Sequence, residues 1–381
     1  MRLDAHIVKL ASYGARVGTQ DEPVQFNVFI AVNLMDRSFL NRRSFINTAA
    51  VALTASALPV WAQGAPEKTK VGIAVGGKAA FYYLPLTIAE QLGYFKAEGL
   101  EVEISDFAGG SRALQAVVGG SADVVSGAYE HTINLQAKAQ MFQAFVLQGR
   151  APAVSLGVSV KAMPNYKTLA DLRGKKIGIS APGSSTNMVA NMILARGGLK
   201  PGDVSFVGVG TAAGALAAFR AGQIDAMSNI DPVMTMLEQK GEIRIIADTR
   251  SLKGTQEIFG GPMPAGCLYA PTEFIQKNPR TVQALTNAMV RALKWLQTAG
   301  PGDIIKTVPE SYLLGDRALY LASFNKVREA ISLDGVIPDD GPRTALRMLA
   351  SFEETLKPEK IVLERTYTNE FARKAKARFK A

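Results

Sequence analysis

The chain of 381 residues has few of the side chains that most enzymes use at their active sites. It contains one cysteine, Cys267, and of its two histidines only His131 lies after residue 62. One cysteine excludes an intrachain disulfide and a cluster of thiolate metal ligands. A zinc enzyme or a Ser-His-Asp hydrolase would have to be built around one histidine, and no Gly-x-Ser-x-Gly motif accompanies it. We therefore expect no catalytic residues, no metal site and no cofactor.

Long apolar segments and blocks of one charge are also lacking. No apolar run reaches the roughly 20 residues that a membrane-spanning helix needs. The formal net charge is +10, but the basic residues are dispersed, without the basic blocks interleaved with aromatics that are typical of nucleic-acid binding. With 48% hydrophobic residues, the chain can bury one large core or two medium ones. The composition favours a globular protein of two lobes that binds no nucleic acid.

Residues 1–62 have the layout of an N-terminal extension followed by an export signal. Arg42 and Arg43 precede an Ala-rich apolar stretch at 48–59, and small or short residues then lead to Ala62. This order is typical of a twin-arginine signal. The alternative is a buried Ala-rich helix preceded by a chance pair of arginines. We expect export, cleavage after Ala62 and a periplasmic location.

Short β-type runs alternate with segments of helical period from Lys70 onwards. This alternation predicts an α/β fold with parallel sheets covered by helices. Pro85 and Pro232 stand near the starts of two predicted helices, where first-turn amides lack intrahelical partners and a proline is tolerated. The strand candidates include residues 70–75, 101–107, 123–126, 176–180, 204–209 and 225–228.

An internal repeat indicates two lobes of one design. The pattern Ala-Leu-x-Ala, Gly, Asp and Ser at 113–126 recurs at 215–228 with a constant offset of 102 residues. Each copy is typical of a helix that ends at a glycine, followed by a short strand that opens at an aspartate. The alternative is chance similarity between two generic α/β units.

Several segments resemble a known family. The stretches at 83–90 and 93–102, which include Gly-Tyr-Phe-Lys-Ala-Glu-Gly-Leu, are similar to the opening of substrate-binding proteins of the nitrate/sulfonate/taurine-type ABC importers. Further matches are Asp-Leu-Arg-Gly-Lys within 168–178 and the segment at 221–226. The likeness covers roughly residues 68–300.

The resemblance implies a two-lobed Venus-flytrap fold of the type II periplasmic binding proteins, with two mixed or parallel sheets flanked by helices. It assigns 68–155 and 268–381 to lobe 1 and 156–267 to lobe 2, with chain crossings near 149–158 and 266–270. The helices after about Pro301 are expected to brace lobe 1. The implied partners are a small ligand and an ABC permease with its cytoplasmic ATPase, and we expect a monomer.

Ligand contacts are expected in five loops that lead from predicted strands into helices. Ligands of open α/β sheets bind at such loops, and helix N-termini offer an anion unpaired amides and a partial positive charge. The strongest signal is three hydroxyls that follow Gly183. The candidate ligand-binding residues are Phe81, Tyr82, Gly110, Ser111, Arg112, Gly127, Ala128, Tyr129, Gly183, Ser184, Ser185, Thr186, Asn229 and Asp231.

Each candidate also has an ordinary structural interpretation. The aromatics could pack in a core, and the serines could be helix caps. Exposed cations such as Lys78 and Arg112 are commonplace, and His131 could be a packed ring or a cap. Asp231 could cap the helix that follows it, although its carboxylate would also suit an amine-bearing ligand.

The sequence thus predicts ligand binding without chemistry, followed by delivery to a permease. A small organic anion such as a sulfonate, taurine, nitrate or carboxylate fits the loops, and aromatic or pyrimidine-type solutes are compatible with Phe81, Tyr82 and Tyr129. One alternative is an enzyme on the same scaffold that resembles the synthases of the thiamine pyrimidine precursor, which use histidines and a cysteine cluster. Another is a sensing module that reports its ligand to a membrane receptor.

Overall fold

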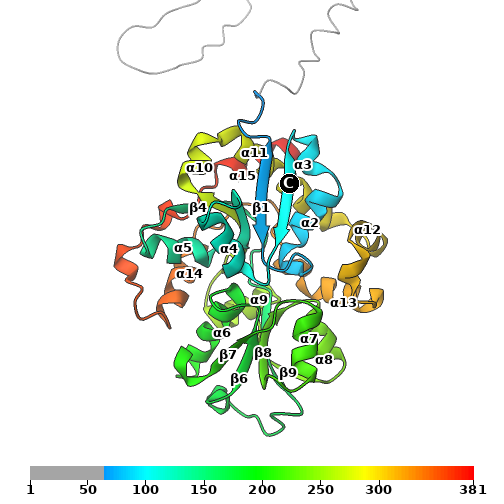
Figure 1. The fold of residues 1–381 in the computed structure, drawn as a ribbon, viewed down its shortest axis with the longest axis vertical. Coiled ribbons are helices and arrows are strands. Elements are labelled where there is room, and N and C mark those ends of the chain that lie inside the picture. The colour runs from blue at the N-terminus through cyan, green and yellow to red at the C-terminus, as the bar shows by residue number, and fades with distance from the viewer. Residues whose placement is uncertain (1–63) are drawn as a thin grey trace, which may run out of the picture. The chain divides into compact units, whose positions relative to one another are not determined.

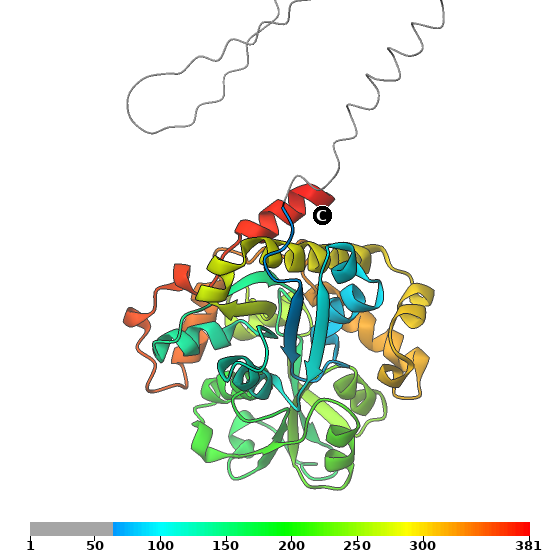
Figure 2. The same cartoon turned by 45° about the horizontal axis from the view of Figure 1, so that its top comes forward.

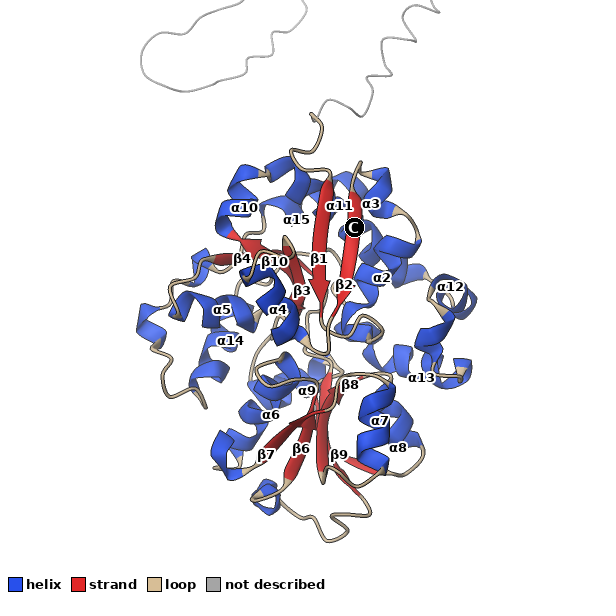
Figure 3. Ribbon diagram, in the orientation of Figure 1, coloured by secondary structure: helices blue, strands red, loops and turns tan. Residues whose placement is uncertain are grey.

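The computed structural model describes residues 64–381, and the predicted export signal with its cleavage site lies outside this range. The described chain forms two α/β lobes, each built around one five-stranded sheet (Figures 1 and 3). Within this range no helix has the length and apolar character needed to cross a bilayer. The predicted fold class, two lobes with mixed sheets flanked by helices, is confirmed.

The sheet of the first lobe has the strand order β2-β1-β3-β10-β4. β1 pairs in parallel with β2 and β3, whereas β10 runs antiparallel to β3 and β4. These strands are β1 (Lys70–Val75), β2 (Glu101–Asp106), β3 (Val124–Ala128), β4 (Phe142–Leu147) and β10 (Gly266–Pro271).

The sheet of the second lobe repeats this plan with the order β7-β6-β8-β5-β9. β6 is parallel to β7 and β8, and β5 is antiparallel to β8 and β9. In each sheet the antiparallel strand is the one that has crossed over from the other lobe. These strands are β5 (Val154–Ser159), β6 (Lys176–Ile179), β7 (Ser205–Gly208), β8 (Ala226–Ile230) and β9 (Ile243–Asp248).

The internal repeat is confirmed, because an offset of 102 residues maps β3 onto β8 from end to end. Its aspartates play the same part in both copies. Asp123 accepts a hydrogen bond from the backbone N–H of Gly72 at 2.9 Å, and Asp225 accepts one from Lys176 at 2.8 Å. Each aspartate thereby ties the start of its strand to the central parallel strand beside it.

Helices cover both sheets. In the first lobe, the long helix α11 packs against α2, α3 and α15 (Figure 2). The helices of this lobe are α2 (Leu84–Gln91), α3 (Tyr94–Ala97), α4 (Gly110–Val118), α5 (Glu130–Ala137), α10 (Thr272–Lys277) and α11 (Pro279–Thr298). Those of the second lobe are α6 (Ser185–Arg196), α7 (Ala213–Arg220), α8 (Val233–Gln239) and α9 (Leu252–Phe259).

The C-terminal segment contacts both lobes, rather than the first lobe alone as expected. α13 packs against α8, and α14 packs against both α5 and α6. An ion pair of 2.8 Å between Lys326 and Glu238 joins α13 to the second lobe. The helices of this segment are α12 (Pro301–Thr307), α13 (Arg317–Val327), α14 (Gly341–Ala350) and α15 (Glu370–Phe379).

All six strand candidates correspond to observed strands, but two strands are longer than predicted. β3 continues through Ala128 because the antiparallel β10 pairs with its end, Gly266 opposite Ala128. β8 continues through Ile230 because β5 pairs with it in the same way. Consequently Gly127, Ala128 and Asn229, which were expected in loops, lie within strands.

Candidate ligand-binding site

The loops that follow β1, β2 and β3 in the first lobe face those that follow β6, β7 and β8 in the second. One contact is a backbone hydrogen bond of 3.1 Å from the N–H of Phe81 to the carbonyl of Asp231. Another is the close approach of Gly77 to Thr211. The structure therefore brings together loops that lie more than 100 residues apart in the sequence, and it does so in a closed arrangement of the lobes.

Two serines form the most direct polar contact between the lobes. The backbone N–H of Ser111, in the first turn of α4, donates to Ser184 Oγ at 3.1 Å. Ser111 Oγ donates to the carbonyl of Pro182 at 2.8 Å, and the two hydroxyl oxygens are 3.1 Å apart. Ser184 stands at the N-cap position of α6, yet its hydroxyl does not cap its own helix. The N-termini of α4 and α6 thus meet through their serines.

His131 forms a second polar bridge between the lobes. Its Nε2 lies 3.1 Å from the carbonyl of Gly183, and its Nδ1 lies 2.7 Å from the hydroxyl of Tyr269. Because a carbonyl only accepts, Nε2 carries the proton and Nδ1 accepts from the tyrosine. Burial lowers the pKa of His131 to about 4, so the ring is neutral near pH 7.

A glycine permits the close approach of the lobes. A Cβ on Gly109 would lie 2.8 Å from Cβ of Ala181 and 2.9 Å from Ser184 Oγ, both in the second lobe. The backbone of Gly109 is extended, with φ at −177°, so alanine would introduce no backbone strain. The nearest obstacles to a side chain at this position are atoms of the opposite lobe.

Gly109→Ala is therefore expected to weaken ligand binding by roughly tenfold, because the added methyl group holds the lobes apart, while the melting temperature without ligand changes little. Isothermal titration with the compound that stabilises the wild type most would measure the effect. The matched control is Gly202→Ala, since a Cβ there meets no atom within 4 Å. Unchanged affinity in Gly109→Ala would show that this approach of the lobes is not needed for binding.

A cavity of about 590 Å³ opens beside these contacts. Helices α4, α5 and α6 and residues 352–356 surround it, and Ser111, His131 and Gly183 reach it from the interlobe contacts. This volume lies within the range of ordinary small-molecule sites. A solute in this cavity therefore has access to one side of the interlobe contacts.

Two aromatic candidates lie against α13 and against the start of β10. The ring of Phe81 is 4.5 Å from that of Tyr320 and 6.1 Å from that of Phe324, both on α13. The ring of Tyr82 packs against the backbone at Gly266, where β10 begins. Phe81 thus has packing partners of its own, whereas the Tyr82 hydroxyl has no hydrogen-bond partner among the described residues.

Several other candidates form their hydrogen bonds with residues of their own lobe. Exposed Arg112 bonds to Gln115 of its own helix at 3.3 Å. The hydroxyl of Tyr129 lies 2.5 Å from that of Thr366. Thr186 Oγ1 accepts from the backbone N–H of Ser180 at 2.9 Å, as part of the turn before α6. The ligand-binding roles of these residues stay predictions.

The remaining candidates have neighbours of their own. Lys78 forms an ion pair of 2.6 Å with Glu90 in the first lobe. Asn229 donates to the carbonyl of Gly210 at 3.0 Å in the second. Gly110 begins α4, Gly127 and Ala128 lie in β3, and Ser185 begins α6. The ligand-binding roles of these four residues also stay predictions.

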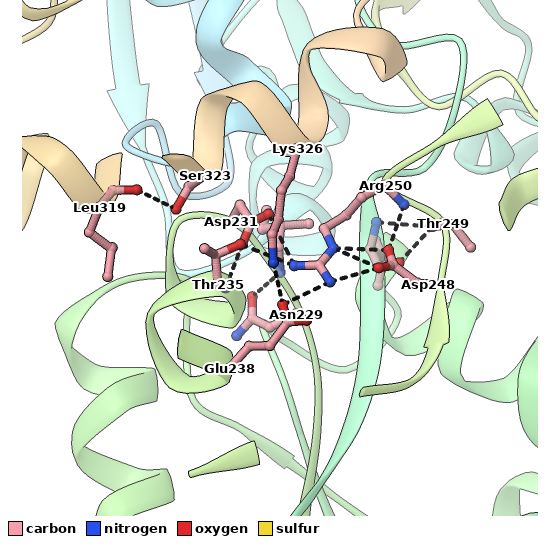
Figure 4. A network of polar contacts seen from close by, with 12 residues as sticks. Asn229, Asp231, Thr235, Glu238, Asp248, Thr249, Arg250, Leu319, Ser323 and Lys326 are labelled. Carbon is pink, nitrogen blue, oxygen red and sulfur yellow. Dashed lines mark hydrogen bonds and ion pairs between the residues drawn. The ribbon is translucent and has the colours of Figure 1, made fainter. Parts of the chain in front are cut away.

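Asp231 belongs to a buried charge network around Arg250 (Figure 4). Arg250 lies 2.6 Å from Asp248, 3.0 Å from Glu238 and 3.5 Å from Asp231. The Asp231 carboxylate also accepts from the backbone N–H of Thr235 at 2.7 Å. Burial raises the pKa of Asp231 and the charge of Arg250 opposes this rise. The carboxylate that was expected to suit an amine therefore already faces a guanidinium.

Sequence reasoning missed three residues of this region. Glu130 was not singled out because an acidic residue in the first turn of a helix is usually an exposed partner of the helix dipole. Arg250 follows a strand without any motif, and Tyr269 lies inside a buried strand. The sequence signal that could have indicated Glu130 is its position next to His131, directly after a predicted strand.

The two lobes, the two crossings between their sheets and the opposed helix N-termini define a solute-binding protein of the periplasmic binding protein fold. A model of the NMT1-like family matches residues 64–307, and the chain belongs to this family.

Similar proteins agree with this class. A protein of Bacillus subtilis (strain 168) that is named as a binding protein, YtlA, is 23% identical over 64% of this chain and 71% of its own. A solved structure from Bordetella bronchiseptica RB50 is 62% identical, with a TM-score of 0.82, over 83% of this chain and 99% of that one. The alkanesulfonate-binding protein SsuA of Xanthomonas axonopodis pv. citri, solved with MOPS bound, shares the fold at 19% identity and a TM-score of 0.61, over 80% of this chain and 99% of that one. The predicted resemblance to nitrate/sulfonate-type binding proteins is confirmed.

Proposed function

We propose that the protein is the extracytoplasmic solute-binding component of an ABC importer, and that it binds a small organic anion between its lobes. The observation that carries this proposal is the meeting of α4 and α6 at Ser111 and Ser184. Two helix N-termini, one from each lobe, present backbone N–H groups and partial positive charge at one place. An anion placed between them would be held by both lobes and would stabilise the closed arrangement.

The ligand class is a sulfonate, a taurine-like compound, nitrate or a carboxylate. The alkanesulfonate-binding function of the Xanthomonas protein supports a sulfonate as the ligand. A sulfonate or carboxylate can accept several hydrogen bonds at once, which suits two serine hydroxyls and the amides beside them. Sulfonates are therefore the first compounds to test.

In this proposal the lobes close on the ligand, and the closed form docks on a membrane permease whose ATPase drives uptake. The monomeric protein acts in the periplasm after cleavage following Ala62. The sensing module and the enzyme related to thiamine pyrimidine synthesis are the competing functions. Uptake of labelled solute in cells with and without this protein separates transport from sensing, and mass analysis of the compound after incubation would reveal conversion by an enzyme.

The proposal is tested by a thermal-shift screen against sulfonates, nitrate, carboxylates, amino acids and pyrimidines. A ligand that binds only the native state raises the melting temperature, by an amount that grows with its concentration relative to Kd. We expect one or more small anions to stabilise the protein. Stabilisation by uncharged pyrimidines alone would contradict the proposed ligand class.

Replacing both Ser111 and Ser184 with alanine is expected to weaken binding of the stabilising anion by roughly tenfold to hundredfold, because two hydroxyl donors are lost. Isothermal titration measures the change. The control is Ser251→Ala, which removes the N-cap hydroxyl of α9 that accepts from Gly254 at 3.0 Å. This control should lower stability without changing affinity. Equal affinity of the double variant and the wild type would place the anion elsewhere.

A further inference from the structure

Glu130 is a buried carboxylate without a partner. It is the first residue of α5 and its side chain is fully buried. Neither carboxylate oxygen has a hydrogen-bond partner among the described residues. A glutamate is almost never fully buried unless it is paired. Burying a carboxylate that makes no hydrogen bonds is costly, so this side chain needs a compensating donor.

The position of Glu130 relates it to the interlobe contacts. The next residue, His131, bonds to Gly183 of the second lobe. The charge of Glu130 contributes to raising the pKa of Tyr82 and Cys267, after the larger effect of burial, so the three groups share one poorly solvated region. Ser185 of the second lobe lies beside the hydroxyl of Tyr82. Glu130 therefore lies among residues at the boundary between the lobes.

The polar atoms of this region are mainly acceptors. Gln148 Oε1 is buried without a partner among residues 64–381, while its Nε2 donates to Ser126 Oγ at 2.9 Å. The hydroxyl of Tyr82 can supply a single proton. No lysine or arginine contributes to the environment of Glu130, and burial raises its pKa to about 7. This region of the described chain thus offers oxygen atoms to a ligand that brings its own N–H groups.

Asp231 is a buried carboxylate of the same protein that has a cation beside it, although its Oδ2 has no hydrogen-bond partner among the described residues. It is buried to the same degree, but it faces Arg250 and accepts from Thr235. Of these two buried carboxylates at the lobe boundary, Glu130 is the one without a cation.

We infer that Glu130 binds an amino group of the ligand, with the Tyr82 hydroxyl beside it, so that the solute is an amino-substituted organic anion. This inference rests on the proposed function and deepens it. In this arrangement the anionic group lies between the N-termini of α4 and α6, and the amine lies at Glu130, at the start of α5. The ligand is then recognised at both ends, by helix N-termini at one and by a carboxylate at the other.

The test compares pairs of compounds that differ only in the amine: aminoethanesulfonate with ethanesulfonate, aminopropanesulfonate with propanesulfonate, and aminobutanoate with butanoate. Isothermal titration uses the purified full-length chain and its Glu130→Gln variant. We expect the wild type to bind one amino compound roughly tenfold to hundredfold more tightly than its partner, and the variant to lose this preference. Glu273→Gln, the same change at an exposed surface pair, is the control and should keep the preference.

The outcomes separate the two claims. If both members of every pair bind the wild type equally, the inference fails and the proposed function stands. If no anion binds, both fail. A preference that persists in Glu130→Gln also overturns the inference. Should that variant not fold, Tyr82→Phe removes only a hydroxyl, and an unchanged preference there would count against the inference in the same way.

Discussion

Replacing Arg250 with methionine is expected to lower the free energy of unfolding by about 3–5 kcal/mol. Arg250 is 3% exposed, and its guanidinium faces Asp231, Glu238 and Asp248. Methionine keeps much of the side-chain volume but leaves the Asp231 carboxylate buried without its ion-pair partner. Removing one partner of a buried ion pair is destabilising for this reason, whatever the net contribution of the pair.

Urea denaturation followed by circular dichroism measures this loss. Arg220→Met is the matched control in the same lobe, because Arg220 pairs with Glu242 at 2.9 Å on the surface and such exposed pairs contribute about 1 kcal/mol or less. An Arg250→Met variant that unfolds within about 1 kcal/mol of the wild type would contradict the structural role of the network.

The neighbours Glu130 and His131 are expected to affect the pH dependence of stability in opposite directions. The pKa of Glu130 is raised from 4.5 to about 7, so the folded state holds a proton that the unfolded state releases, and stability falls as pH rises from 4.5 to 7. The pKa of His131 is lowered from 6.5 to about 4, so the unfolded state holds the extra proton, and stability rises from pH 4 to 6.5. Each effect amounts to about 3 kcal/mol, and the two nearly cancel in the wild type.

Single variants should separate the contributions of Glu130 and His131 to the pH dependence of stability. The stability of Glu130→Gln should itself rise by about 3 kcal/mol between pH 4 and 6.5, because only the contribution of His131 remains. His131→Gln should lose about the same amount between pH 4.5 and 7. The measurement is urea denaturation of the three proteins at intervals of pH. Difference curves that are flat across this range would show that neither group has the burial described.

The fold could be predicted because its determinants are local. The repeated aspartates, the glycines at the ends of helices and the prolines in first turns each leave a sequence pattern. The candidates did not include β4, β5, β9 and β10. β5 is buried along its whole length and lacks the alternation that marks a half-buried strand. Its pairing with β8 and β9 is a long-range property that no local pattern encodes.

The site was predictable only in part. Ser111 and Ser184 were found because helix N-termini after parallel strands are places where ligands bind. The direction of the Ser184 hydroxyl, away from its own helix and towards the other lobe, depends on how the lobes approach. Whether Glu130 or Asp231 keeps a free carboxylate depends on Arg250, which lies 120 residues after the first and 19 after the second. Such pairings are set by tertiary structure.

A crystal structure with the compound that stabilises the protein most tests the central claim directly. The account predicts that the anionic group lies between the lobes, within hydrogen-bond distance of Ser111 and of Ser184 or the amides that follow it. A stabilising compound bound outside the interlobe contacts, with Ser111 and Ser184 still bonded to each other, would contradict it.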